Sequence, residues 1–216
     1  MSVITEPCKL CSGKTEILDK PAKPVYYHCP HCDLIFMGEM FLPDSQEEFE
    51  RYKLHNNSLE NQGYVKYLLD FLKDAEIDKM KNVEPALDFG CGPEPVLKVL
   101  LSRQGINADI YDPYLFPARV YTNKKYNLIT STEVLEHLNS PLSTLTLLQS
   151  ILAEEGVLAV KTLFHTTSQD FDKWWYRRDK THVCFYSPKT FHWIANKFKL
   201  KIKKMDNSSI CILARQ

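Results

Sequence analysis

The sequence lacks the features that direct a protein to a membrane. Its 216 residues do not open with an apolar signal segment. They also contain no run of about 18 or more apolar residues, the length needed to span a bilayer. Net charge is absent as well, because 27 lysines and arginines balance 27 aspartates and glutamates. These absences predict a cytoplasmic protein without a membrane partner, and they disfavour nucleic acid as a partner.

No internal repeat or low-complexity tract is present either, and the composition predicts one α/β core with a small additional unit. Hydrophobic residues make up 44% of the chain and charged residues 25%, proportions typical of a globular protein. The most basic stretch, Lys197–Lys204, alternates lysine with apolar residues. This alternation predicts a half-buried strand, with an RNA-binding stripe as the alternative. The balanced charge favours a small or neutral substrate.

Glycine is scarce, with seven in the chain, yet two lie close together in residues 86–95, Ala-Leu-Asp-Phe-Gly-Cys-Gly-Pro-Glu-Pro. A short apolar strand leads into Asp88, Gly90 and Gly92, and a helix-forming stretch follows at 96–103. This order is typical of a nucleotide-cofactor turn, although an ordinary tight turn has the same pattern. The third glycine of the dinucleotide fingerprint is missing, which favours a nucleoside cofactor without phosphates.

The following segments predict a parallel sheet. A second apolar strand ends at Asp112, about 20 residues after the glycine turn, the spacing of a carboxylate that binds ribose hydroxyls. A strand at 126–131, a helix at 141–153 and a strand at 157–162 come next. Alternating strands and helices indicate an α/β fold with helices on the sheet faces.

Three motifs in this order resemble class I S-adenosylmethionine-dependent methyltransferases of the type 11 or type 23 kind. They are Leu-Asp-Phe-Gly-Cys-Gly, then Tyr-Asn-Leu-Ile-Thr-Ser-Thr-Glu-Val-Leu-Glu-His-Leu, then Gly-Val-Leu-Ala-Val-Lys-Thr. The resemblance spans residues 86–198. It implies a Rossmann-like, mostly parallel sheet of the seven-stranded type with an antiparallel last strand, and S-adenosyl-L-methionine as the cofactor.

One edge of this sheet departs from the family pattern. Only residues 113–126, with two prolines, stand where the family has a helix and a further strand, so we expect an abbreviated edge and leave the adenine contacts unassigned. The resemblance assigns cofactor contacts to ten residues: Tyr64, Asp88, Phe89, Gly90, Cys91, Gly92, Asp112, Pro113, Thr132 and Glu133.

Cysteine pairs near the amino-terminal end predict a metal site. Cys8 and Cys11 form one Cys-x-x-Cys pair, and Cys29 and Cys32 form another. Four thiolates at this spacing suit tetrahedral zinc. Two disulfides are the poorer alternative, because nothing in the sequence predicts an oxidising compartment.

The two pairs define a predicted zinc ribbon at residues 1–42. A segment of this size cannot build a core of its own, so a structural role for zinc is the simplest interpretation. The alternative is a module that binds a protein partner or covers the substrate. We expect Cys91, Cys184 and Cys211 to be buried thiols.

Residues 43–82 predict a helical linker before a methyltransferase domain at 83–216. We expect one or two helices across the cofactor cleft, with Tyr52, His55, Asn56 and Tyr64 as candidate lid side chains. A loop held by asparagine turns is the alternative interpretation.

The candidate catalytic residues are Glu133, Glu136, His137 and His182. If the segment after the strand at 126–131 is helical, the first three share one face and could hold a divalent metal. The set resembles the metal-binding residues of small-RNA 3′-terminal 2′-O-methyltransferases, in part also those of ubiquinone-pathway O-methyltransferases, which implies Mg²⁺ or Mn²⁺. Alternatively, Glu133, His137 or His182 acts in catalysis without metal, a histidine being the general base, or His137 only packs the helix end.

The candidate acceptor residues follow the strand at 157–162. Trp174, Trp175 and Tyr176 could line an apolar pocket with Arg177 or Arg178 holding an anion, although core packing is the ordinary role of a tryptophan. We therefore predict transfer of a methyl group to a hydroxyl or carbon of a small-molecule metabolite. An RNA methyltransferase and a non-catalytic S-adenosylmethionine-binding protein are the alternatives.

Overall fold

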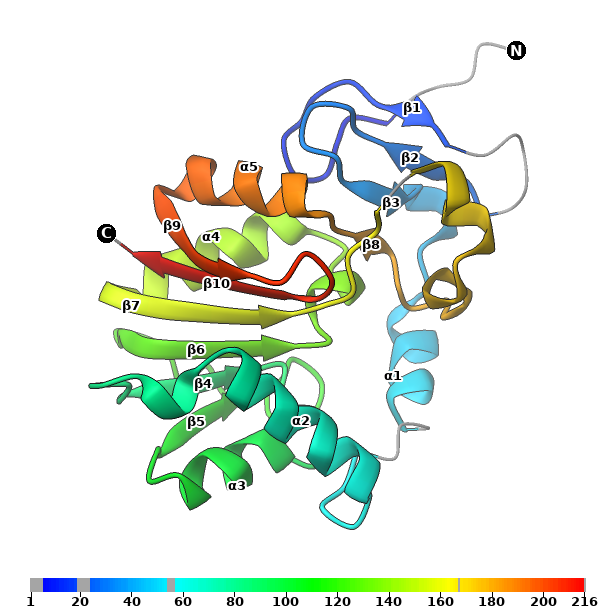
Figure 1. The fold of residues 1–216 in the computed structure, drawn as a ribbon. Coiled ribbons are helices and arrows are strands. Elements are labelled where there is room, and N and C mark those ends of the chain that lie inside the picture. Colours follow the sequence, from blue (N-terminus) through cyan, green and yellow to red (C-terminus); the bar gives the residue numbers. More distant parts are fainter. Residues whose placement is uncertain (1–5, 19–23, 54–56, 167, 216) are drawn as a thin grey trace.

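The central sheet of the chain has six strands in a computed structural model that describes residues 6–18, 24–53, 57–166 and 168–215 (Figure 1). The strand order is β5-β4-β6-β7-β10-β9. The first four of these run parallel, whereas β10 is antiparallel to both β7 and β9. The predicted α/β sheet is thereby confirmed. Its strands are β4 Ala86–Phe89, β5 Ala108–Tyr111, β6 Tyr126–Thr132, β7 Leu152–Lys161, β9 Leu200–Met205 and β10 Ile210–Arg215.

The edge of the sheet beside β5 is abbreviated, as predicted. Between β5 and β6, all of which the structure describes, the chain adds no strand and forms only an isolated bridge from Asp112 to Phe116. Pro113 and Pro117 flank this bridge, and proline has no amide hydrogen to donate to a ladder. The short connection therefore crosses the sheet end as a turn.

Helices cover both faces of the sheet. Helices α2 and α3 lie on one face, and α4 and α5 lie on the other (Figure 1). In α2 the buried residues Leu68, Phe71 and Leu72 recur at helical spacing, so the helix presents one apolar stripe to the sheet. Burying one such side chain stabilises the fold by roughly 1.5–3 kcal/mol. The helices are α2 Gln62–Asp74, α3 Val96–Arg103, α4 Pro141–Ile151 and α5 Pro188–Phe198.

A second, small sheet is formed mainly by the cysteine-bearing segment, residues 6–18 and 24–37. Its order is β1-β2-β3-β8, with β1 Glu16–Ile17, β2 Tyr26–His28, β3 Ile35–Met37 and β8 Cys184–Phe185. The fourth strand comes from far along the chain and pairs Phe36 with Cys184. Leu34, Ile35 and Phe36 are fully buried, in the same apolar cluster as α4 and α5. The cysteine-bearing segment therefore shares both a sheet and a core with the rest of the molecule.

Polar contacts fix the second cysteine pair to the start of α5. The Asp33 carboxylate accepts hydrogen bonds from His28 Nε2 at 2.8 Å and from Ser187 Oγ at 2.6 Å. His165 Nε2 donates to the backbone oxygen of Asp33 at 2.8 Å. Ser187 is also the N-cap of α5 and forms a capping box with Thr190. Asp33 thus joins the cysteine-bearing segment to α5.

Several elements gather over the carboxyl ends of the parallel strands (Figure 1). Helix α1 (Ser45–Lys53) and the 3-10 turn η5 (Trp175–Arg178) lie there, next to β8. The predicted helices of the 43–82 segment are present as α1 and α2, with a short turn η2 (Ile77–Lys79) after them. His55, Asn56 and the Tyr52 side chain lie outside the described residues.

The segment after β6 differs from the helix considered above. Glu133 has a φ of +52°, in the left-handed region, and only a 3-10 turn η3 (Leu135–His137) follows. The backbone reversal at Glu133 prevents a helix from starting there, because a right-handed helix needs a negative φ. Short 3-10 turns η1 (Glu39–Phe41) and η4 (Ser168–Lys173) complete the elements. Within the described ranges, no helix is both long enough and apolar enough to cross a bilayer.

Candidate functional site

The turn between β4 and α3 holds the two glycines predicted to meet a cofactor. Gly90 has a φ of +83° and Gly92 a φ of +69°, values that favour glycine. A Cβ atom on Gly90 would lie 2.3 Å from Cγ2 of Val134, so this glycine lets the turn pack on the loop after β6. A Cβ on Gly92 would meet no atom within 4 Å. Open space therefore adjoins the second glycine.

Asp112 borders this space from the end of β5. Its Oδ2 accepts the amide of Gly92 at 3.3 Å, and its Oδ1 accepts the amides of Tyr114 and Leu115 at 3.0 and 3.1 Å. A carboxylate offers about four lone-pair sites, so acceptor capacity remains for a hydroxyl donor. The half-buried position of Asp112 suits a ribose ligand.

Asp88 lies near the end of β4, two residues before Gly90. It is 2% exposed, and its Oδ1 accepts a hydrogen bond from Thr130 Oγ1 at 2.9 Å. Burial raises the pKa of Asp88 to about 7, and the nearby charge of Asp112 adds to the effect. Asp88 therefore lies buried and hydrogen-bonded to β6, and it is not an open surface of the cleft.

The other predicted cofactor residues surround the same turn. Phe89 packs on Tyr111 with the ring centroids 5.1 Å apart, and Cys91 is buried. Pro113 is exposed beyond Asp112, and Thr132 is half-buried at the end of β6. The structure brings these residues together, and their contacts with a cofactor stay predictions.

Helix α2 presents two tyrosines to the cleft. Burial raises the pKa of Tyr64, and the charges of Asp88 and Glu133 raise it further. One helical turn later, Tyr67 donates a hydrogen bond to Glu133 Oε1 at 2.5 Å. Lys161 Nζ lies 4.5 Å from the centre of the Tyr67 ring. The helix therefore closes one side of the cofactor cleft.

A buried pair of carboxyl groups lies beyond this helix. The Tyr176 hydroxyl is 3.1 Å from Glu133 Oε2 and also hydrogen-bonds to Glu136 Oε1. Burial, with the neighbouring charge of Glu136, raises the pKa of Glu133 to about 8, and burial raises the pKa of Glu136. We infer that a proton is retained on this pair at neutral pH, because two like charges so close are costly to ionise together.

Two histidines, His137 and His182, lie beside Glu136 of this pair. His137 Nδ1 hydrogen-bonds to the backbone oxygen of Thr181 at 2.9 Å, and His182 Nδ1 to that of Tyr176 at 2.8 Å. A carbonyl only accepts, so Nδ1 carries the proton and the ring lone pair lies on Nε2. Burial lowers the pKa of His137 to about 3 and also lowers that of His182. Both imidazoles are therefore neutral near pH 7.

Glu136, His137 and His182 could together hold a metal ion. One potential ligand atom from each lies within 4.8 Å of the others. Among the described residues, Glu136 Oε2 is a buried oxygen without a hydrogen-bond partner, and so are Ser131 Oγ and Thr162 Oγ1 at the nearby ends of β6 and β7. Two imidazoles and a carboxylate suit Zn, Fe or Mn better than Mg²⁺, which prefers oxygen ligands. Glu133 is outside this three-residue cluster.

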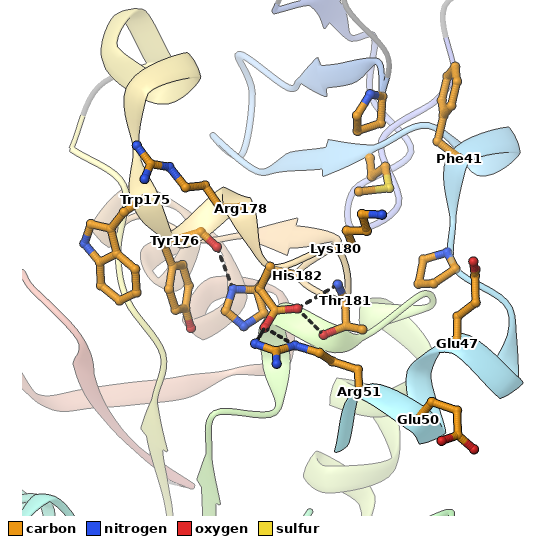
Figure 2. Close-up of a pocket in the computed structure, with 14 residues that line it drawn as sticks. Phe41, Glu47, Glu50, Arg51, Trp175, Tyr176, Arg178, Lys180, Thr181 and His182 are labelled. Atoms are coloured by element: carbon orange, nitrogen blue, oxygen red, sulfur yellow. Dashed lines mark hydrogen bonds and ion pairs between the residues drawn. The ribbon is translucent and has the colours of Figure 1, made fainter. Parts of the chain in front are cut away.

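A cavity of about 950 Å³ opens next to His182. Figure 2 shows its lining residues, which come from α1, from the 174–182 segment and from the cysteine-bearing segment. Tyr176 and His182 belong to its lining and also contact the carboxyl pair or the second histidine. Tyr176 therefore links the cavity to the buried carboxyl pair.

The predicted acceptor residues divide into two groups. Trp175 and Tyr176 line the cavity, and so does Arg178. Trp174 instead packs on Phe171 and Phe185, and the Arg177 guanidinium lies 4.6 Å from the Tyr26 ring centre.

The four predicted zinc ligands form a second cluster. Cys8 and Cys32 have their sulfur atoms 3.5 Å apart, and Cys11 and Cys29 have theirs 3.4 Å apart. These distances are too long for disulfides and close to the separation of about 3.8 Å in a tetrahedral site with Zn–S bonds of about 2.3 Å. Backbone amides of Leu10 and Gly13 point at Cys8 Sγ and Cys11 Sγ, each at 3.4 Å. The donor set therefore fits zinc.

Three residues of the site were missed in the sequence. Tyr67 could have been found, since it follows Tyr64 by three positions on a helix and so shares its face. Arg51 hydrogen-bonds to Asp179 Oδ2 through Nε at 2.8 Å and Nη2 at 2.6 Å, across 128 positions of sequence. No local pattern predicts such a pair.

A comparison with protein families matches residues 57–204, more than half of the chain, to a family described as a methyltransferase domain (Methyltransf_23). No functionally curated protein is significantly similar in sequence.

Solved structures with the same fold include a methyltransferase described as S-adenosylmethionine-dependent from Archaeoglobus fulgidus. It is 14% identical with a TM-score of 0.53, and the match covers 80% of this chain and 100% of that one. An O-methyltransferase family protein from Burkholderia thailandensis is 9% identical with a TM-score of 0.52, and the match covers 78% of this chain and 63% of that one. At such identities the likeness shows the fold.

Proposed function

Because the chain belongs to the methyltransferase-domain family, we propose that it transfers a methyl group from S-adenosylmethionine to an oxygen or carbon of a small molecule. One observation carries the proposal. Gly90 of the turn packs on Val134, the residue after Glu133, and Tyr176, which hydrogen-bonds to Glu133, lines the cavity together with His182. A cofactor over the turn and an acceptor in the cavity would therefore both approach Glu133 and Tyr176.

The cofactor would lie over the glycine turn. Gly92 leaves the space for it, and Asp112 offers the remaining lone pair to its ribose. Tyr64 would cover it from α2, with Glu133 beyond. When bound, S-adenosylmethionine supplies a sulfonium methyl group that is already electrophilic. The protein therefore needs chiefly to align the acceptor and to exclude water.

His182 is the proposed general base. Its Nδ1 donates to a backbone carbonyl, so the lone pair on Nε2 can accept the proton that leaves the acceptor hydroxyl or carbon. His137 lies beside it, with the ring centroids 4.8 Å apart, and orients the ring by packing. In the alternative, a bound metal would use Glu136, His137 and His182 and would lower the pKa of an acceptor hydroxyl as a Lewis acid, and His182 would then be a ligand instead of the base.

Zinc is proposed at the four cysteines as a structural ion. The sulfur separations and the amide hydrogen bonds to Cys8 and Cys11 support this. The ion would tie the loop that carries Cys8 and Cys11 to the loop that carries Cys29 and Cys32.

The test is calorimetric titration of the zinc-loaded protein with S-adenosylmethionine and S-adenosylhomocysteine. We expect micromolar binding that falls at least tenfold in Asp112→Ala, about the value of one hydrogen bond to a charged group. Asp78→Ala, which removes an exposed carboxylate away from the turn, is the matched control and should bind as wild type. Absence of binding by the wild-type protein would reject the proposed function. Repeating the titration with Mn²⁺ or Mg²⁺ tests the metal cluster separately.

A further inference from the structure

We infer that the cavity beside His182 is the acceptor site, that the cysteine-bearing segment forms part of its wall, and that the acceptor joins a flat apolar body to an anionic group. This inference rests on the proposed function, because it takes the cavity as the place where the methyl acceptor binds. It assigns a chemical class to that acceptor and a role in acceptor binding to the amino-terminal segment.

The cavity has the size and composition of a small-molecule site. Its volume of about 950 Å³ is within the range of ligand pockets. Its apolar lining includes Pro24 and Met37 of the cysteine-bearing segment and Phe41 and Pro43 just after it. Trp175 is 62% exposed and lies on the side opposite Phe41 (Figure 2). A flat apolar group fits between these sides, since an exposed indole offers a stacking surface.

The inner end of the cavity leads to the reacting centre. His182 and Tyr176 are among its lining residues, and Tyr176 hydrogen-bonds to both Glu133 and Glu136. An acceptor that fills the cavity would therefore direct one end at His182, the proposed general base. Its opposite end would extend toward Arg178, on the side of Trp175 (Figure 2).

The charged groups that line the cavity are separated in space, with Glu47 and Glu50 on α1 and Arg178 on the side of Trp175 (Figure 2). Arg51 and Asp179 neutralise each other in a hydrogen-bonded ion pair. On α1, Glu47 Oε2 accepts the amide of Asp44, and Glu50 Oε1 accepts from Gln46. Two cations also line the cavity, Arg178 and Lys180, and within the described part of the chain neither has an ion pair or hydrogen bond.

These two cations can therefore receive a carboxylate or phosphate. Arg178 is close to Trp175 along the chain and shares the same side of the cavity (Figure 2). An anion bound there would be attached to the group stacked on the indole. Charge-assisted hydrogen bonds of this kind are among the stronger polar contacts available to a ligand.

The experiment compares three probes of one shape and different charge: naphthoate, naphthamide and naphthylmethylamine. Binding to the zinc-loaded protein saturated with S-adenosylhomocysteine is measured by ligand-observed nuclear magnetic resonance at low ionic strength. We expect naphthoate to bind about tenfold more tightly than the other two, as expected for one charge-assisted contact at a partly exposed site.

Variants separate the parts of the inference. Arg178→Gln and Lys180→Gln should each remove most of the preference for naphthoate, whereas Lys201→Gln, an exposed lysine on β9 at the far edge of the sheet, should retain it. Pro24→Glu adds an acid to the wall from the cysteine-bearing segment and should weaken naphthoate binding alone. Trp175→Ala should weaken all three probes by about fivefold, the value of one aromatic stacking contact.

Three results would overturn the inference: equal or tighter binding of naphthylmethylamine, a preference that survives both cation variants, or no naphthoate binding to protein that binds S-adenosylhomocysteine. Failure to bind S-adenosylhomocysteine would instead reject the proposed function. The probe comparison, repeated on the protein without cofactor, would then still decide whether the cavity is an anion site.

Discussion

The glycine turn proposed to bind the cofactor and the cavity proposed to bind the acceptor are built in different ways. The turn arises from one short stretch, in which β4, two glycines and Asp112 lie within 27 residues, 86–112, of each other. The cavity is assembled from segments as far apart as Pro24 and His182. The turn is rigid because its backbone is hydrogen-bonded locally, whereas the cavity depends on long-range packing between the small sheet, α1 and η5.

This difference teaches where change is tolerated. A local turn keeps its shape as long as its own dihedral angles and neighbours are kept. A cavity between segments changes shape whenever one of those segments shifts. Variation among relatives should therefore concentrate at the cavity, which is where a methyltransferase would acquire a new acceptor.

Removing the metal from the cysteine cluster should have the largest effect. In Cys32→Ser we expect loss of zinc and a fall in the free energy of unfolding of about 3 kcal/mol or more, or roughly 10 °C in melting temperature. Amides of β2, β3 and β8 should exchange faster than those of β4 and β5, because the proposed ion lies beside the small sheet. Metal analysis, thermal unfolding and hydrogen exchange measure these effects.

The control for this variant is Cys211→Ala, which removes a buried thiol outside the cluster. It should cost about 1 kcal/mol and leave the zinc content unchanged. A Cys32→Ser protein with wild-type melting temperature would contradict a structural ion.

Replacing Gly90 with alanine should disrupt the glycine turn and leave the cavity unchanged. The new Cβ would lie 2.3 Å from Val134 Cγ2 at a φ of +83°, so we expect a loss of about 2–4 kcal/mol in unfolding free energy. Gly92→Ala should cost only the backbone strain of about 1–2 kcal/mol, since its Cβ meets open space, but should abolish S-adenosylhomocysteine binding.

Gly105→Ala is the matched control for both glycines, because Gly105 has a φ of +80° and no atom within 4 Å of the added Cβ. It should show the strain without the loss of binding. Denaturant unfolding and calorimetry give the two readouts. Equal binding by all three variants would remove the glycine turn from the cofactor site.

Asp88→Asn should reveal how much unfolding free energy the buried Asp88 carboxyl costs at each pH. The pKa of Asp88 is raised from 3.8 to about 7 by burial, so the folded protein retains a proton that the unfolded chain releases. Wild type should therefore lose unfolding free energy relative to Asp88→Asn as the pH rises from about 4 to about 7, by about 4 kcal/mol, and the difference should then stay constant.

Denaturant unfolding of both proteins at several pH values measures this difference. The buried histidines titrate in both proteins, so their contribution cancels. A difference that does not change with pH would show that Asp88 is ionised throughout.

The smallest effect is expected at the ion pair between Arg51 and Asp179, which lines the cavity. Arg51→Gln removes the ion pair with Asp179, whose pKa the Arg51 hydrogen bonds lower despite burial. The Arg51 side chain is 41% exposed, so we expect a loss of only about 0.5–1 kcal/mol, reduced further by high salt. A double-mutant cycle with Asp179→Asn measures the coupling. A coupling above about 2 kcal/mol would mean that this pair holds α1 in place.

The sequence was sufficient where structure depends on neighbouring residues. The limits of α3 and the abbreviated edge after Asp112 follow from local sequence pattern and proline chemistry. The cysteine spacing likewise placed four thiols together.

The remainder depends on contacts that sequence patterns do not encode. The left-handed φ of Glu133 replaced the helix considered for the candidate catalytic residues with a 3-10 turn. The pairing of β3 with β8, and of Arg51 with Asp179, joins positions more than 100 residues apart. A pattern of local periodicity cannot report them, because it only describes which face of an element is apolar.

The pairing of Phe36 with Cys184 also sets an order of events during synthesis. The small sheet is made first, yet one edge of β3 stays open until the ribosome has added roughly 150 further residues, and an open edge can pair with another chain. Zinc bound early would hold the nascent segment in shape during that interval. A protein truncated before β8 would then carry its metal and an exposed strand edge, and it should associate with itself instead of remaining a stable fragment.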